Sequence, residues 1–256
     1  MPYAVEFPIA SGDHPPPPNL YRALYANLMQ WMGAAYPGLG DVIHDRPVRK
    51  PFTLSALEKG RDGDWRWRVT LLEDDLWEPL WSGVQVVGVL DLNGRTWPVR
   101  WLDAQVTHRG YDFLLTGVRP AECIKMEFLS PTTFRAGNLD SPLPEPGAVF
   151  HSWLSRWNDF APPDRRISTE LLETVRTNVA ISAHRMRTER HDLGRSQVVG
   201  FLGKVTFVIT KARRLNQALV WQLNALADYA EFCGTGRKTT HGMGQTRRMQ
   251  HKHQSY

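Results

Sequence analysis

The chain has 256 residues, of which 42% are hydrophobic and 10 are tryptophan, so it can form one large domain or two small ones with their own cores. Its two cysteines, Cys123 and Cys233, form no CxxC pair, which argues against a disulfide scaffold and fits a reduced cytoplasmic protein. The N-terminus lacks a signal-peptide pattern, and no apolar run approaches the ~20 residues of a membrane span, so we expect no membrane contact.

Positive charge is concentrated in the second half of the chain. Residues 1–120 contain 12 Lys and Arg against 14 Asp and Glu, whereas residues 121–256 contain 19 against 12. From Arg176 onward there are 14 basic against 4 acidic residues, and ten of the basic ones are arginine. Because clustered guanidinium groups suit bidentate phosphate contacts, this pattern favours a nucleic-acid partner over an ordinary solvated basic surface.

The first half predicts secondary structure in the order β-α-β-β-α-β. Apolar residues alternate from Tyr3 to Ile9, as in a half-buried strand, and recur at helical spacing from Leu20 to Met32 behind Asn19 as an N-cap. The other expected elements are a loop up to residue 50, strands over 52–57 and 65–72, a helix over 74–87, and one or two strands within 96–115. This order is that of the ferredoxin-like split βαβ arrangement.

The second half fits the same arrangement. The expected elements are a strand over 123–129, a loop or hairpin arm over 130–135, helices over 150–160 and 169–175, a hairpin of strands 179–189 and 197–209, and a helix over 214–231. The predicted fold is therefore α+β, with two tandem ferredoxin-like (RRM-like, βαββαβ) domains spanning residues 1–118 and 119–256.

A glycine-rich segment near the C-terminus carries the strongest motif. Gly234 and Gly236 on one side, and Gly242 and Gly244 on the other, flank the five residues Arg237, Lys238, Thr239, Thr240 and His241. Exposed backbone N–H groups beside Arg and Lys suit phosphate. The spacing differs from that of a P-loop, and the segment follows a helix-like run, so a polyanion backbone is favoured over a nucleotide.

His44 is the candidate for proton transfer. It lies in the predicted loop beside Arg46, Arg49 and Lys50, a combination that suits metal-free cleavage of RNA. RNA carries its own nucleophile, the 2′-OH, and an imidazole can remove that proton or protonate the leaving 5′-oxygen, while a nearby ammonium stabilises the charge on phosphorus. Taken alone, a loop histidine with a few cations is more often an ordinary surface cluster.

Two motifs together resemble a known family. The segment GTGRKTTHGMG (Gly234–Gly244), after a Leu-rich helix, resembles the glycine-rich loop of the CRISPR repeat-RNA processing endoribonucleases of the RAMP superfamily. The block from His44 to Ser55, with its KPFTLS sequence, resembles the His-containing loop and following strand of the same family. The resemblance spans nearly the whole chain.

The resemblance implies an activity and a partner. Family members consist of two tandem ferredoxin-like domains, bind the CRISPR repeat as single strand or stem-loop, and cut once within it without metal. The products carry a 2′,3′-cyclic phosphate and a 5′-OH, and many members pass the processed RNA to an effector complex. We therefore expect no metal and no small-molecule cofactor.

The resemblance also implies site residues. His44 corresponds to the catalytic histidine as general acid or base, and Lys50 to a catalytic lysine of some members. Those members also use a tyrosine within or after the first helix, for which Tyr36 and Tyr25 are both candidates. The residues expected to bind RNA are Arg46, Arg49, Thr53, Ser55, Thr133, Arg135, Arg185, Arg187, Arg237, Lys238, Thr239, Thr240 and His241. For the residues of the glycine-rich loop, a role in supporting the fold is as well favoured as a role in binding phosphate.

Two other functions stay open from the sequence. One is a non-catalytic RNA-binding subunit of a CRISPR ribonucleoprotein complex, which has the same fold and does not need His44. The other is a phosphate- or nucleotide-binding metabolic enzyme built on the glycine loop, for which binding would depend only weakly on salt.

Overall fold

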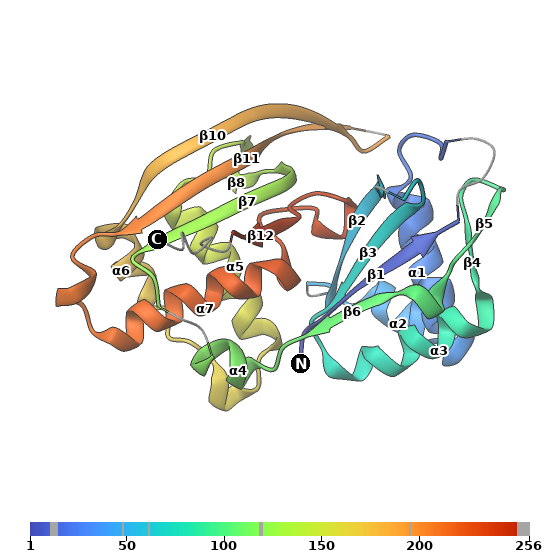
Figure 1. Cartoon of the computed structure of the whole chain (residues 1–256), viewed down its shortest axis with the longest axis horizontal. Helices are drawn as coiled ribbons and strands as arrows, with labels where there is room; N and C mark the ends of the chain where they lie inside the picture. The colour runs from blue at the N-terminus through green and yellow to red at the C-terminus, as the bar shows by residue number, and fades with distance from the viewer. Residues whose placement is uncertain (11–14, 48, 61, 118–119, 195, 250–256) are drawn as a thin grey trace. The chain divides into compact units, whose positions relative to one another are not determined.

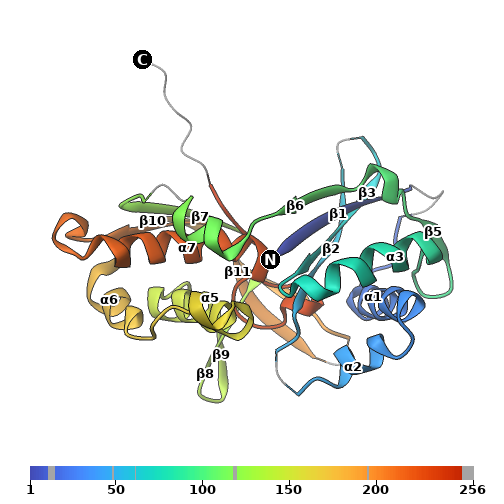
Figure 2. The same ribbon diagram turned by 90° about the horizontal axis from the view of Figure 1, so that it is seen from below.

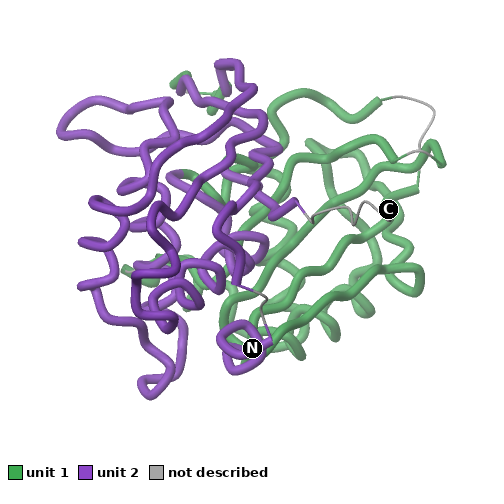
Figure 3. The backbone as a smooth tube through the Cα atoms, turned by 60° about the vertical axis from the view of Figure 1, so that its left-hand side comes forward, with its two compact units in different colours: residues 1–110, 192–197, 238–243 green, residues 111–191, 198–237, 244–256 purple. Residues whose placement is uncertain are grey.

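The computed structural model describes residues 1–10, 15–47, 49–60, 62–117, 120–194 and 196–249. The chain divides into two compact units, drawn in different colours in Figure 3. Unit 1 comprises residues 1–110, 192–197 and 238–243, and unit 2 comprises residues 111–191, 198–237 and 244–256. The predicted boundary between residues 118 and 119 lies outside the described residues, so it stays a prediction.

Unit 1 contains one four-stranded antiparallel sheet in the order β2-β3-β1-β6. Its elements are β1 (Tyr3–Ile9), α1 (Tyr21–Ala35), α2 (Leu39–Asp45), β2 (Phe52–Lys59), β3 (Trp65–Leu71), a 3₁₀ turn η1 (Asp74–Leu76), α3 (Trp77–Val87), the small pair β4 (Val89–Asp91) and β5 (Thr96–Pro98), η2 (Trp101–Asp103) and β6 (Gln105–His108). Helices α1 and α3 pack together over one face of the sheet (Figures 1 and 2).

The core of unit 1 lies between these helices and the sheet. Leu24, Leu28 and Trp31 form the buried face of α1, and they meet Phe7 and Trp67 from the sheet. The rings of Trp31 and Trp67 pack edge to face with centroids 5.3 Å apart, and burial of such large apolar side chains is the main source of stability. This core fixes α1 against the sheet and thereby positions the side chains on the exposed part of the helix.

Unit 2 repeats the topology, with a sheet in the order β10-β11-β7-β12. Its elements are α4 (Tyr111–Thr116), β7 (Cys123–Thr132), the small hairpin β8 (Phe134–Ala136) and β9 (Leu139–Ser141), α5 (Pro146–Phe160), η3 (Pro163–Arg165), α6 (Leu171–Asn178), β10 (Val179–Asp192), β11 (Gln197–Ile209), η4 (Ala212–Arg214), α7 (Gln217–Cys233), η5 (Thr239–His241, whose residues cluster with unit 1) and β12 (Thr246–Arg248). Helices α5 and α7 lie on one face of this sheet (Figure 2).

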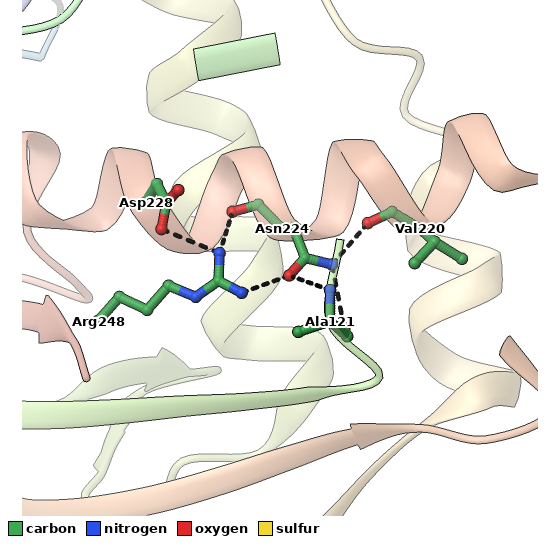
Figure 4. Close-up of polar contacts among 5 residues, drawn as sticks. All are labelled: Ala121, Val220, Asn224, Asp228 and Arg248. Atoms are coloured by element: carbon green, nitrogen blue, oxygen red, sulfur yellow. Dashed lines mark hydrogen bonds and ion pairs between the residues drawn. The ribbon is translucent and has the colours of Figure 1, made fainter. Parts of the chain in front are cut away.

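Strand β12 is tied to α7 by a partly buried polar cluster (Figure 4). The Arg248 guanidinium donates to the Asp228 carboxylate at 2.9 Å and to Oδ1 of Asn224 at 2.5 Å. The Asn224 amide also bonds to both backbone groups of Ala121, just before β7. The Asn224 side chain on α7 thus bonds both to Arg248 on β12 and to Ala121 just before β7. These bonds hold α7, β7 and β12 together.

The predicted fold is confirmed, since each unit contains the βαββαβ order of elements. Three local predictions were wrong, and one strand, β12, was not predicted. Residues 39–45 form the helix α2 rather than a loop, and residues 111–116 form the helix α4 rather than a strand. Asn19 does not cap α1, because the N-cap residue is Leu20 and no side chain caps this helix; the Asn19 amide donates instead to the Asp192 carboxylate at 3.0 Å.

Among the helices within the described ranges, none has the length and apolar composition that a membrane crossing requires.

Candidate active site

His44 lies in the last turn of the short helix α2, with its side chain exposed. The helix forms here because Leu39 and Ile43, four residues apart, both pack against the core of unit 1, which leaves the neighbouring His44 on the solvent side. Its Nδ1 lies 3.3 Å from the hydroxyl of Tyr25 on α1, and the two rings meet edge to face. The structure therefore joins two side chains from different helices into one polar pair.

Tyr25 is the centre of a small aromatic cluster. Its ring lies 5.7 Å from His44, 5.6 Å from Phe52 and 6.3 Å from His241, centroid to centroid. Burial raises the pKa of the Tyr25 hydroxyl, so this group keeps its proton at neutral pH and can donate it in a hydrogen bond. The imidazole of His44 and that of His241 thus both contact one protonated tyrosine.

Tyr36, the second tyrosine considered from the sequence, lies elsewhere. Its hydroxyl donates to the carboxylate of Glu78 on α3, and this hydrogen bond is the main cause that raises its pKa. The structure therefore favours Tyr25 over Tyr36 as the tyrosine beside His44. Sequence spacing could not separate the two, because the choice depends on the path of the chain between α1 and α2.

Lys50 holds the end of α2. Its ammonium donates to the carbonyl oxygens of Ile43 at 3.0 Å, of His44 at 2.5 Å and of Arg46 at 2.7 Å. These are carbonyls that a helix C-terminus leaves without intrahelical partners, and a cation is favoured there by the helix dipole. All three N–H donors of Lys50 are used by the backbone that carries His44, so the geometry favours a positioning role over a direct contact with phosphate.

Other basic and polar residues near His44 serve the fold of unit 1. Arg46 donates to both carboxylate oxygens of Glu73, at 2.9 and 2.8 Å. Thr53 and Ser55 on β2, expected to touch RNA, are only 1% and 5% exposed. The hydroxyl of Thr53 is 2.7 Å from that of Thr70, and the hydroxyl of Ser55 bonds to backbone groups within the sheet, so neither supports a phosphate contact. Arg49 is exposed.

The glycine-rich loop has two limbs, residues 234–237 and residues 244–246, and both are fixed within unit 2. The N–H of Thr235 donates to the carbonyl of Gly244 at 2.8 Å, which closes the loop at its base. The limbs also bond to the end of β7, through Arg237 N–H to Thr133 and Gly244 N–H to Pro131, both at 3.0 Å. A Cβ at Gly236, where φ is +75°, would overlap with the carbonyl of Thr133, so glycine is needed for this close approach.

A buried arginine supports the same limb. Arg156 on α5 donates to the carbonyl of Gly236 at 2.6 Å and to the hydroxyl of Ser152 at 2.7 Å, while the N–H of Gly236 donates to that same hydroxyl at 2.9 Å. Trp153 donates through Nε1 to the hydroxyl of Thr235 at 2.8 Å. Sequence reasoning missed these residues, since a single arginine within an amphipathic helix gives no signal of what it reaches.

The tip of the loop clusters with unit 1. Lys238, exposed and with φ of +59°, precedes the single 3₁₀ turn η5, and Gly242 with φ of +80° ends it. Thr239 is buried, whereas Thr240 and His241 are half-buried, with Nδ1 of His241 2.9 Å from the Thr240 hydroxyl. The turn packs against β2 and α1, which brings His241 to the aromatic cluster around Tyr25.

The predicted RNA-binding residues of unit 2 differ in exposure. Thr133 is buried and donates to the carbonyl of Ser141. Arg135 is exposed, and both it and Arg237 form ion pairs with Asp140 on β9, the Arg135 pair at 3.6 Å. The remaining two predicted residues, Arg185 and Arg187, are exposed on the long strand β10. Of the predicted RNA-binding residues of unit 2, Arg135, Arg185 and Arg187 are therefore exposed, and Arg187 also pairs with Glu189 at 3.4 Å.

Solved structures share this architecture. The product complex of Cas6 (TTHB231), a protein of Thermus thermophilus, superposes with a TM-score of 0.84 at 24% identity and covers 97% of this chain and 100% of that one. The product complex of Cas6 (TTHA0078) superposes with a TM-score of 0.79 at 25% identity and covers 98% and 100%. These likenesses establish a shared fold over nearly the full length of both chains.

Sequence comparison gives the family. The family model for the CRISPR-associated endoribonuclease Cas6 matches residues 126–246. The Cas6 endoribonuclease of Streptococcus thermophilus is 23% identical over 235 residues, which cover 91% of this chain and 92% of that protein. The Cas6 endoribonuclease of Mycobacterium tuberculosis is 31% identical over 238 residues, which cover 88% of this chain and 70% of that protein. The chain therefore belongs to the CRISPR-associated endoribonuclease Cas6 family.

Proposed function

We propose that this protein binds CRISPR repeat RNA and cuts it once per repeat by metal-independent attack of a 2′-OH on the adjacent phosphate, leaving a 2′,3′-cyclic phosphate and a 5′-OH. The observation that carries the proposal is the exposed imidazole of His44 beside the protonated hydroxyl of Tyr25. Family membership and the solved Cas6 complexes with a product and a substrate mimic support the choice of RNA as substrate.

In this mechanism His44 transfers a proton and Tyr25 orients it. A hydrogen bond to Nδ1 fixes the direction of the imidazole and leaves Nε2 to face the RNA. Lys50 holds the turn that carries His44, through its three bonds to backbone carbonyls. A positioned side chain that transfers a proton in the transition state contributes about 10²- to 10⁴-fold in rate.

RNA affinity is assigned to unit 2 and the loop. Arg185 and Arg187 extend from β10, and Lys238 and Arg135 lie in or near the glycine-rich loop, all with exposed side chains. Each contact with a phosphate releases counterions, so affinity for repeat RNA falls steeply as salt rises. A metabolic enzyme that binds a small phosphate ester would show a weak dependence on salt instead.

The test is cleavage of 5′-labelled repeat RNA in EDTA by the wild type, His44→Ala and His108→Ala. His108 is an exposed histidine on β6 and serves as the matched control. We expect a single cut by the wild type and by His108→Ala. His44→Ala should cleave at least 100-fold more slowly, with its affinity for RNA changed only a few-fold. RNA with a 2′-deoxy group at the cleavage site should not be cut. Tight binding without cleavage by the wild type would favour a non-catalytic RNA-binding subunit, and a metal requirement would contradict the mechanism.

A further inference from the structure

Unit 2 contains an open pocket between α4 and the first two turns of α7 (the α4–α7 pocket), and the two helices lie side by side in Figure 1. Its volume is about 420 Å³, which is within the range of pockets that bind small ligands or single groups of larger ones. The lining side chains come from both helices and are those of Leu115, Thr116, Ala218, Trp221 and Gln222. Neither the catalytic proposal nor the glycine-rich loop uses any of them.

The walls of this pocket are held in place by the core of unit 2. Tyr111 and Leu114, three residues apart on α4, are both buried, and the Tyr111 ring packs edge to face on Trp157 with centroids 4.9 Å apart. On α7, Trp221 and Gln222 are half-buried, and the rest of each side chain is open to the pocket. Both helices are therefore positioned by packing that does not involve the pocket itself.

The lining combines an indole ring with a side-chain amide. Within the part of the chain that the structure describes, neither Nε1 of Trp221 nor the amide of Gln222 forms a hydrogen bond with another protein group. The hydroxyl of Thr116, in contrast, donates to the Asp112 carbonyl of its own helix at 2.8 Å. An indole ring stacks on the face of any nucleobase, and an amide offers a donor and an acceptor that match the edge of a base.

Two unpaired cations lie where the chain enters α7. Lys211 precedes the turn η4 and Arg214 ends it, and both side chains are exposed. Among the described residues, neither cation takes part in an ion pair. Exposed cations beside an aromatic ring are the means by which proteins hold single-stranded nucleic acid, with phosphates on the cations and a base on the ring.

Acidic side chains of the adjoining segments are paired with arginines. Asp112 on α4 forms an ion pair with Arg165, which also pairs with Asp164 at 2.9 Å. Glu122, just before β7, pairs with Arg213 of η4 at 3.5 Å. The net positive charge of this surface therefore comes from the two unpaired cations. An apolar side chain of a partner protein would fill the pocket but leave both cations unused, so the charges favour RNA as the occupant.

We propose that the α4–α7 pocket holds one unpaired base of the repeat RNA, with Trp221 stacked on the base and Gln222 bonded to its edge. Lys211 and Arg214 bind the adjoining phosphates. The inference rests on the binding of repeat RNA proposed above and adds to it a contact in unit 2. The base must come from a single-stranded part of the RNA, because the bases of a duplex are stacked on one another and do not enter a pocket.

The first experiment measures the affinity of the wild type, Trp221→Leu and Trp221→Phe for repeat RNA. The RNA carries a 2′-deoxy group at the cleavage site, so that it stays intact during the titration. Leucine keeps the apolar packing of the indole but cannot stack on a base, whereas phenylalanine keeps a flat ring. We expect Trp221→Leu to bind about tenfold more weakly than the wild type, and Trp221→Phe to recover most of that loss.

RNA that lacks a single base identifies the bound nucleotide. We expect removal of one particular base to lower the affinity of the wild type about tenfold. The same removal should change the affinity of Trp221→Leu much less, because the contact is already lost in that variant. If no base behaves in this way, the proposal is wrong. Equal affinity of the wild type and Trp221→Leu for intact RNA would also overturn it, and would leave the pocket to an apolar side chain of a partner protein.

A second variant keeps the test decisive if Trp221→Leu does not fold, which thermal melting would reveal. Gln222→Ala removes an amide that forms no hydrogen bond within the described residues, and Gln85→Ala, at an exposed position on α3, is its matched control. We expect Gln222→Ala to bind repeat RNA at least threefold more weakly and Gln85→Ala to bind as the wild type does. Equal binding by both variants would contradict the pocket alone, whereas a wild type that does not bind repeat RNA would refute the proposed function itself.

Discussion

The contact of Lys50 with the end of α2 leads to a prediction about Lys50→Met. Methionine keeps most of the apolar stem but removes the ammonium that bonds to the carbonyls of Ile43, His44 and Arg46. Hydrogen bonds to a charged group contribute about 1.5–3 kcal/mol each when nothing replaces them. Because His44 is exposed, water can replace part of what is lost, so we expect the last turn of α2 to lose about 2 kcal/mol in total.

That loss converts into a cleavage rate. Helix α2 has only seven residues and is too short to be stable without tertiary support. If the last turn must be ordered for His44 to act, about 2 kcal/mol corresponds to a rate roughly 30-fold lower, since each 1.4 kcal/mol is about tenfold. RNA affinity should stay within a few-fold of the wild type, because the ammonium is directed at the backbone rather than at the RNA.

The assay combines single-turnover cleavage with amide hydrogen exchange of residues 42–46. Lys50→Met should lower the rate and speed exchange in that segment together, while Lys59→Met, at the exposed end of β2, changes neither. A lower rate with unchanged exchange would show that Lys50 acts directly on the phosphate, and the positioning argument would be refuted. An unchanged rate with faster exchange would show that the order of this turn does not limit cleavage.

Two further predictions concern stability. In urea unfolding, Gly236→Ala should destabilise unit 2 by more than about 2 kcal/mol, because its Cβ would overlap with the Thr133 carbonyl. The control Gly137→Ala is also at positive φ but has open space around it, so it should lower the free energy of unfolding by only about 1 kcal/mol. Burial, and then the hydrogen bond to Asp74, raise the pKa of Tyr3 to about 12. The unfolded chain loses this proton first, near pH 10, so stability should fall between about pH 10 and 12 in the wild type. Tyr3→Phe should lack this part of the fall, and an equal decline in both proteins would contradict the assignment.

The fold could be predicted from the sequence because it depends on hydrophobic periodicity. Alternation over Tyr3–Ile9 and helical spacing from Leu20 to Met32 correspond to β1 and α1 in the structure. The elements that were missed are short, and their conformation comes from tertiary contacts. Helix α2 needs Leu39 and Ile43 to reach the core, and the three-residue strand β12 is fixed by pairing with β7.

The candidate site was predictable in its residue types but not in its geometry. His44 and the loop stand out by composition, but the bonds of Lys50 to the backbone and the burial of Thr53 depend on how the chain turns between α1 and β2. The choice of Tyr25 depends on the same turn. Asp140 pairs with two of the predicted RNA-binding arginines, Arg135 and Arg237, and its pairing with Arg237 shows that a cation can be partly neutralised by a residue distant in sequence.

Two candidate site residues of unit 1, His44 and His241, lie on very short elements. His44 is on a seven-residue helix and His241 on a single 3₁₀ turn, and neither element is long enough to be stable by its own hydrogen bonds. Both depend on polar contacts with backbone, from Lys50 for α2 and from the limb contacts for the loop. A substitution that removes only the support of α2, such as Lys50→Met, should therefore lower the cleavage rate well before it lowers the melting temperature. This separates it from substitutions in the aromatic core, such as at Trp31 or Trp67, where loss of stability comes first.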